Sequence, residues 1–421
     1  MQSRNNILTR LWRLIILVGP GFFLIGYSIG TGSVVSMASA GSRYGMSLLW
    51  ALILACVFSF VMLEAYGRYT LVTGESALYS YRKLPVLGRT AAIVTLIGLV
   101  FVEVLALAGI MGILSDLICE WFKMLAPGIA WAPLWIAIFI IIGIFIFLWI
   151  GKYTFFEKIL IIFVSLMGVS FILTMFLVIP DPVEMVKGAV PKLPHDPNVS
   201  MLISALVGTT LTAPTFVMRS IIVKEKGWTI SDLKAGRRDA FFAALFMFII
   251  SVSIMACAAG TLYIASKPVE DTIQMVKLLE PLAGRFALSV FICGIIGAGL
   301  SSIIPITLLA PLLIGDYRGS PVNMKSKMFR ILCGIALLFG LVVPVFQARP
   351  VFAMIVSQCF QILVLPIVTV SIIYLLNRKD LMGQYKAGPW LNGGLLATLL
   401  FSLFITYQSV IGLVNYLGKV F

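Results

Sequence analysis

The sequence predicts an all-α polytopic membrane protein built from two inverted copies of a five-helix unit. Three observations lead to this prediction. Of the 421 residues, 61% are hydrophobic and 11% are charged, and the mean hydropathy of +1.08 lies far above that of a soluble domain. Apolar stretches of membrane-spanning length recur along the whole chain. Two of these stretches contain Pro-interrupted segments that lie about 194 residues apart.

Eleven stretches are long and apolar enough to cross a membrane as helices. They lie at about 12–40, 47–71, 91–118, 131–150, 156–179, 199–222, 240–265, 286–314, 329–347, 350–376 and 391–417. Together they use nearly every residue, so we expect one transmembrane domain over residues 1–421.

The first five stretches match the next five at an offset of about 194 residues. Repeat one covers about 12–179, repeat two covers about 199–376, and the last helix, at about 391–417, lies outside the repeat. Five is an odd number, so the second copy enters the membrane from the opposite side. The result is an inverted repeat about an axis in the membrane plane.

Positive charge is sorted between the two sides of the membrane. The formal net charge is +14, with 31 Lys and Arg. Nine of these residues fall in one set of alternate connections: Arg43, Lys123, Lys187, Lys192, Lys267, Lys277, Arg285, Arg349 and Lys419. Arg219 lies inside a span, and the remaining 21 fall in the other set, which includes the N-terminus. Because positive charge favours the cytoplasm, we expect a multi-pass plasma (bacterial inner) membrane protein with a cytoplasmic N-terminus and an external C-terminus. This sorting argues against a nucleic-acid partner.

The two interrupted segments are Gly19-Pro20-Gly21-Phe22 and Ala213-Pro214-Thr215. Unwound backbone in hydrocarbon leaves N–H and C=O groups unpaired, so such breaks persist only where they line a cavity. A single proline in a membrane helix is commonly a simple kink. Two breaks in register across a repeat instead predict a substrate site near mid-membrane, as in transporters that work by alternating access.

The remaining chemistry-bearing residues do not form a catalytic or cofactor site. The six cysteines lie within or at the ends of spans and show no metal-ligand spacing, so we interpret them as packing residues. His195 is the only histidine and belongs to a polar Pro-rich loop. We therefore expect no metal cofactor, no other cofactor and no enzymatic activity.

Several further motifs occur in a characteristic order. They are Ala40-Gly41-Ser42-Arg43-Tyr44-Gly45-Met46-Ser47-Leu48-Leu49-Trp50, Thr73-Gly74-Glu75, Phe156-Glu157-Lys158, Val190-Pro191-Lys192-Leu193-Pro194, Gly299-Leu300-Ser301-Ser302, Ser357-Gln358 and Leu365-Pro366. In this order the chain resembles the NRAMP family of proton-coupled divalent-metal transporters over nearly its full length. The resemblance implies the amino acid-polyamine-organocation (LeuT-like) fold with broken helices 1 and 6.

The chain departs from the NRAMP pattern at the metal site. The family's helix 1 motif is Asp-Pro-Gly-Asn, which we align with Gly19-Pro20-Gly21-Phe22, and its helix 6 motif is Met-Pro-His, which we align with Ala213-Pro214-Thr215. The retained positions are Pro20, Gly21, Pro214 and Gln358. When helix 3 is registered on Glu103, the family's two later acidic positions fall on Ile110 and Ile113, so the usual proton relay is missing.

These departures argue against Mn²⁺ or Fe²⁺ transport in the family manner, because a bare divalent ion needs hard oxygen ligands that include a carboxylate. The favoured substrate is an organic or anionic small solute, bound by half-helix N-termini with Arg219 one turn beyond Thr215. The alternative substrate is a divalent cation, hydrated like Mg²⁺, in a remodelled site. For Arg219 the alternative interpretation is a residue that snorkels to the membrane surface.

The other residues expected near the substrate leave alternatives open. The small residues Gly26, Ser28, Gly30, Thr31, Gly32 and Ser33 either leave room for a substrate or serve close helix packing. Glu103 is a possible proton site, whereas Glu64 is expected to pair with Arg68 one turn away. A binding-only sensor with the same fold is a second hypothesis, and the sequence does not indicate the oligomeric state.

Overall fold

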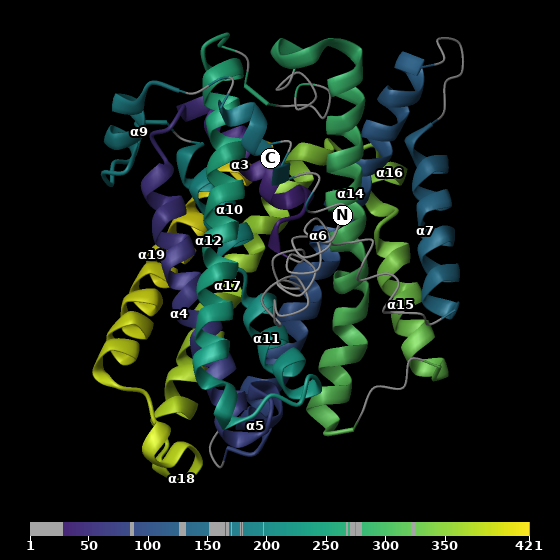
Figure 1. Ribbon diagram of the computed structural model, residues 1–421. Coiled ribbons are helices and arrows are strands. Elements are labelled where there is room, and N and C mark those ends of the chain that lie inside the picture. The colour runs from purple at the N-terminus through teal and green to yellow at the C-terminus, as the bar shows by residue number, and fades with distance from the viewer. Residues whose placement is uncertain are drawn as a thin grey trace, which may run out of the picture.

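The computed structural model describes residues 28–84, 88–125, 132–150, 165, 168–169, 171–176, 178, 180–196, 198–266, 268–269, 274, 280–320 and 325–420 (Figure 1). These residues form helices and their connections, and no β-strand occurs among them. The all-α prediction is therefore confirmed.

The long helices coincide with the predicted spans. They are α4 (Leu49–Thr73), α6 (Gly88–Leu125), α7 (Pro133–Ile150), α12 (Leu233–Ala258), α14 (Glu280–Arg318), α15 (Lys327–Phe339), α17 (Pro350–Asn377) and α19 (Pro389–Val420). In the described part of the chain, eight segments are long and apolar enough to cross a membrane, and α7 is a shorter apolar helix. Most of the predicted spans at 12–40 and 156–179 lies outside the described residues, so the count of eleven stays a prediction.

The second predicted helix break is present. Helix α10 (Val199–Thr210) stops at Leu211, and α11 (Ala213–Glu225) begins two residues later with Thr212 as its N-cap. Pro214 lies in the first turn of α11, where a proline costs little because the first N–H groups of a helix have no intrahelical partner.

The first predicted break lies outside the described residues, and a bend follows it in the described part of the chain. Helix α3 (Thr31–Tyr44) begins after a bend at Ile29 and Gly30, whereas the predicted segment Gly19–Phe22 lies outside the described residues. The predicted break at Pro20 and the offset of about 194 residues therefore stay predictions. A Cβ atom at Gly30 would lie 1.9 Å from the Ser302 hydroxyl oxygen of α14. The bend therefore lies where the backbone of Gly30 approaches another helix closely.

The half-helices α3, α10 and α11 are almost completely buried, and the long helices α4, α6, α12, α14 and α17 surround them (Figure 1). Large apolar side chains are exposed on the outer helices, for example Phe139 of α7, Ile331 of α15 and Leu400 of α19. Such a surface suits lipid rather than water. Five of the six cysteines are buried and form no disulfide, as expected for packing residues, and nothing is described of the side chain of Cys293.

Short helices mark the two ends of the bundle. Helices α5 (Ala77–Arg82) and α18 (Lys379–Met382) lie at one end, and α9 (Pro182–Gly188) lies at the other (Figure 1). We call these the α5 end and the α9 end. The bundle thus separates residues such as Arg82 and Lys379 from Lys187, in agreement with the predicted charge sorting. Which end faces the cytoplasm stays a prediction.

Candidate functional site

A small polar cavity lies beside the two helix breaks and is closed by α6, α14 and α17. Its volume is about 30 Å³, which is room for about one or two water molecules. The lining residues are Ser28, Gly30, Gly32, Ser33, Glu103, Ala106, Ile110, Thr209, Thr212, Ser302, Ile306, Met354, Gln358 and Gln361. Both repeats therefore contribute to one buried site.

Hydroxyl groups join the two interrupted helices across this cavity. Ser28 and Thr215 share a hydrogen bond of 3.1 Å, and Ser33 and Thr209 share one of 3.0 Å. The Ser33 hydroxyl is also 2.7 Å from the backbone carbonyl of Ser28 and donates to it. The unwound segment before α3 is thus held against both sides of the α10–α11 break.

Glu103 brings a carboxylate into the cavity from α6. Its side chain is 3% exposed, and its Oε1 accepts a hydrogen bond of 3.3 Å from the Gln361 amide of α17. Glu103 is the one ionisable residue among the described lining residues. The sequence argument against a divalent cation considered the ligands on the interrupted helices and left ligands elsewhere in the cavity open.

Two further oxygen atoms of cavity-lining residues have no hydrogen-bond partner among the described residues. They are Oε1 of Gln358 and Oγ1 of Thr212, and both are buried. An unpaired buried oxygen is costly, so such atoms commonly mark a place that water or a ligand occupies. Within the described ranges, no group of three or more His, Cys, Asp or Glu side chains forms a metal cluster. Any cation here would rely on one carboxylate together with neutral oxygen ligands.

The other predicted site residues have different positions. Ala213 and Pro214 open α11 without lining the cavity, and Thr215 contributes through its hydrogen bond to Ser28. Gly19, Pro20, Gly21 and Phe22 lie outside the described residues. His195 is exposed in its loop, as the sequence indicated.

Arg219 lies away from the cavity and is paired. Its side chain is 1% exposed and its guanidinium forms an ion pair with Asp239 of α12. The same guanidinium donates a hydrogen bond of 3.1 Å to the carbonyl of Gly236. Arg219 is therefore not a snorkelling residue, and its charge is balanced inside the protein.

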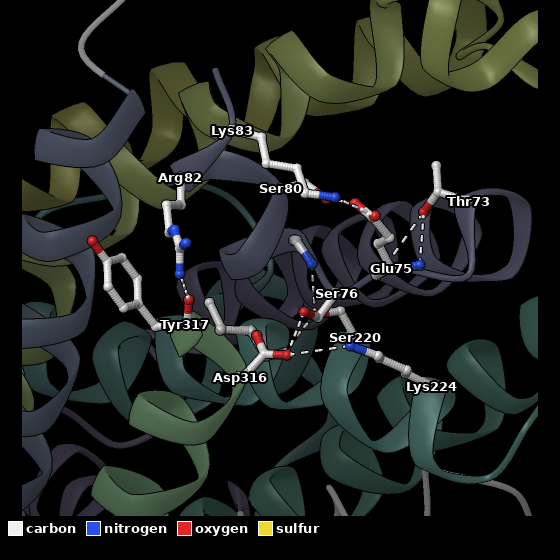
Figure 2. Close-up of polar contacts among 12 residues, drawn as sticks. Thr73, Glu75, Ser76, Ser80, Arg82, Lys83, Ser220, Lys224, Asp316 and Tyr317 are labelled. Atoms are coloured by element: carbon white, nitrogen blue, oxygen red, sulfur yellow. Dashed lines mark hydrogen bonds and ion pairs between the residues drawn. The ribbon is translucent and has the colours of Figure 1, made fainter. Parts of the chain in front are cut away.

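A second polar network ties three elements together at the α5 end (Figure 2). The Ser76 hydroxyl donates to Asp316 of α14, and the Lys224 ammonium of α11 lies 3.8 Å from the same carboxylate. The N–H of Ala77 donates a hydrogen bond of 3.2 Å to the Ser220 hydroxyl of α11. These contacts hold α5, α11 and α14 together below the cavity.

The network extends over the surface of the α5 end. Arg82 donates a hydrogen bond of 2.8 Å to the carbonyl of Tyr317, so α5 and α14 are joined a second time (Figure 2). Glu75 accepts hydrogen bonds from Ser80 and Lys83. Its carboxylate raises the pKa of Lys83, which therefore remains positively charged at neutral pH.

Sequence reasoning missed several residues of the central cavity. Gln361 and Met354 carry no motif of their own, but they lie on the same face of α17 as Gln358, at spacings of three and four residues. That spacing is the signal that could have identified them. Ser302 was noted only as part of a motif, and Gly30 and Gly32 only as small residues.

Two interrupted helices around a polar cavity, inside a bundle of membrane-spanning helices, define the class of secondary transporters with a LeuT-like fold. The sequence profile described as "Nramp: Natural resistance-associated macrophage protein-like" matches residues 21–412. The chain therefore belongs to the Nramp family, and the resemblance noted in the sequence is confirmed.

Curated relatives of similar length share about a fifth of their residues with this chain. The "Divalent metal cation transporter MntH" of Nostoc sp. is 23% identical over 397 residues, which cover 90% of this chain and 87% of the relative. The protein of the same name from Granulibacter bethesdensis is 22% identical over 420 residues, with coverages of 93% and 88%.

Solved structures show the same fold at lower identity. The Eremococcus coleocola manganese transporter superposes with a TM-score of 0.74 at 13% identity and covers 95% of this chain and 87% of its own. MhsT in complex with L-phenylalanine has a TM-score of 0.60 at 16% identity, with coverages of 94% and 98%. At such identities the similarity establishes the LeuT-like fold alone.

Proposed function

We propose that this protein is a secondary transporter that carries a divalent metal cation, bound with part of its water shell, by alternating access through the central cavity. The observation that carries the proposal is the Glu103 carboxylate, the one ionisable group among the described lining residues. Membership of the Nramp family and the names of the curated relatives support the same substrate class.

An anionic solute, which the sequence favoured, has less support. The positive charge expected to bind it belongs to Arg219, which pairs with Asp239 outside the cavity. The half-helix N-termini of α3 and α11 still point their dipoles toward the breaks, but the described lining residues include no cationic side chain that would hold an anion. A volume of about 30 Å³ also suits an ion and a water molecule better than an organic solute.

The available ligands favour a hard cation. Carboxylate, amide and hydroxyl oxygens are offered by Glu103, Gln358 and Thr212, and ions such as Mg²⁺ and Mn²⁺ prefer oxygen ligands. Mg²⁺ in particular keeps several of its waters when it binds to proteins. An ion that keeps part of its water shell needs fewer charged ligands from the protein. Such an ion was the alternative substrate derived from the sequence.

We further propose that Glu103 carries a proton when no cation is bound. An ionised carboxylate is costly inside a membrane-spanning bundle, so we propose that cation and proton compete for Glu103. The α5 end, where the predicted cytoplasmic residues gather, would face the cytoplasm. In this proposal the chain is a carrier and not an enzyme.

The test is uptake into proteoliposomes that contain the purified full-length protein. Mg²⁺, Mn²⁺ and Ca²⁺ are offered separately, and a panel of amino and organic acids is offered in parallel. We expect divalent-cation uptake, and we expect Glu103→Gln to lower it roughly 10- to 100-fold, as loss of a metal-site group commonly does. Glu120→Gln is the matched control on α6, because Glu120 lies near the helix end in a partly exposed pair with Lys123.

The alternatives predict different results. Uptake of an amino or organic acid in the absence of cation uptake would support the anionic substrate instead. Cation binding by calorimetry without any uptake would indicate a sensor.

A further inference from the structure

An apolar groove opens on the outer surface of the bundle between α4 and α12. Its volume is about 290 Å³, and all of its lining residues are apolar. Val57 and Phe60 line it from α4, and Phe241, Leu245 and Phe248 line it from α12. Both helices are long and apolar enough to span a membrane, so the groove lies at the depth of lipid chains.

The groove has a basic end. On α12, Lys234, Arg238, Phe241, Leu245 and Phe248 follow one another at spacings of four, three, four and three residues, which place them on one stripe of the helix. The two basic residues are exposed and lie toward the α5 end. An apolar channel and a pair of positive charges are therefore aligned along one helix face.

Neighbouring charges leave this end positive. Glu64 of α4 already contacts two arginines, Arg68 at 2.7 Å and Arg237 at 3.4 Å. At the start of α12, Asp232 accepts a hydrogen bond of 2.9 Å from the Thr229 N–H, and Asp239 pairs with Arg219. Lys234 and Arg238 form no ion pair with any residue in the described ranges. Phe60 and Phe241 pack edge to face with ring centroids 6.0 Å apart, beside this basic end.

We propose that the groove between α4 and α12 binds an anionic phospholipid, with an acyl chain against Phe241, Leu245 and Phe248 and the phosphate group at Lys234 and Arg238. The apolar lining explains the affinity for a chain, and the unpaired basic residues explain a preference for a negatively charged headgroup. The site lies on the outer surface and is independent of the central cavity.

Native mass spectrometry of the full-length protein with added phosphatidylglycerol or phosphatidylcholine tests the headgroup preference. We expect more bound phosphatidylglycerol than phosphatidylcholine. Each positive charge removed should weaken phosphatidylglycerol binding roughly fivefold, so the double variant Lys234→Ala/Arg238→Ala should lose most of the preference. The control is Lys379→Ala/Lys386→Ala, which removes two exposed charges at the same end of the bundle, away from the groove.

A second pair of variants tests the groove itself. Val57 is 50% exposed, so Val57→Trp fills the groove without disturbing the core, and Val414→Trp adds the same side chain at a site on α19 that is 59% exposed. We expect Val57→Trp, and not Val414→Trp, to lower phosphatidylglycerol binding several-fold. Equal binding of the two lipids, or binding that survives both Val57→Trp and the double charge variant, would overturn the proposal.

Discussion

The Ser28 hydroxyl lies 3.1 Å from the Thr215 hydroxyl, although 187 positions separate the two residues in the sequence. This hydrogen bond joins the interrupted helix of the first repeat to that of the second. The parallel contact between Ser33 and Thr209, at 3.0 Å, gives the junction two hydroxyl pairs. The geometry of the cavity therefore depends on both breaks at once.

We predict that Ser28→Ala and Thr215→Val each weaken cation binding about fivefold, which corresponds to one buried neutral hydrogen bond. Because both variants remove the same contact, the double variant should be little worse than either single variant. Calorimetric titration of the purified proteins measures this. Ser409→Ala, which removes a buried hydroxyl contact to Cys359 on the far side of α17, should leave the affinity unchanged. Additive losses in the double variant would contradict the coupling.

The close approach of Gly30 to Ser302 predicts that a side chain at position 30 impairs uptake and that a smaller residue at position 302 restores it. A Cβ at Gly30 would lie 1.9 Å from Ser302 Oγ and 2.9 Å from its Cβ, so Gly30→Ala should strongly reduce uptake. Gly30 has an extended backbone conformation that other residues also adopt, so the defect is steric. Ser302→Gly in the same chain should restore uptake, and Gly143→Ala, which meets no atom within 4 Å, should have no effect. Failure of the second substitution to restore uptake would argue against this contact.

The buried ion pair of Arg219 and Asp239 allows a test of whether Arg219 stabilises the protein or binds the substrate. Arg219→Met leaves Asp239 as a buried charge without this partner and should destabilise the protein by roughly 3–5 kcal/mol. Adding Asp239→Asn should recover much of the loss, as measured by thermal unfolding in detergent. Cation uptake should recover as well, because neither side chain lines the cavity. A stable double variant that binds an organic anion more weakly than the native protein would instead give Arg219 a place in substrate binding.

The contacts of Asp316 predict that this residue helps to keep the central cavity closed at the α5 end. Asp316→Asn weakens the contacts to Ser76 and Lys224, and hydrogen bonds to charged groups contribute about 1.5–3 kcal/mol each. Its loss should favour opening at this end by about tenfold or more. The measurement is the labelling rate of Thr212→Cys, a cavity position, by an impermeant thiol reagent in an otherwise cysteine-free chain. Asp380→Asn, an exposed residue paired with Arg378, is the control, and equal labelling in both variants would exclude Asp316 from gating.

The helical framework was predictable because the thickness and low polarity of the membrane set the length and the composition of the helices that cross it. The predicted span at 47–71 corresponds to α4 (Leu49–Thr73), and that at 350–376 corresponds to α17 (Pro350–Asn377). In hydrocarbon every backbone polar group must be paired within a helix, so hydropathy alone indicates where helices begin and end.

The site was predictable only in part. Gln358 and Glu103 were recognised by residue type and position, and both line the cavity. The predicted break at Pro20 lies outside the described residues, and the bend at Ile29 and Gly30 was not predicted. A proline is visible in a sequence, but the need for glycine beside Ser302 arises only when α14 packs against that segment.

The sequence by itself indicated the membrane location, the approximate positions of the described long helices, the sorting of positive charge and the Nramp membership, because each depends on composition or on short patterns along the chain. Only the tertiary structure decided which charges meet. It placed Glu103 in the cavity and paired Arg219 with Asp239 outside it. The physical reason is that a charge acts over a few ångströms of space, and these residues come from helices far apart in the sequence. The proposal of a cation rather than an anion as substrate therefore rests on packing.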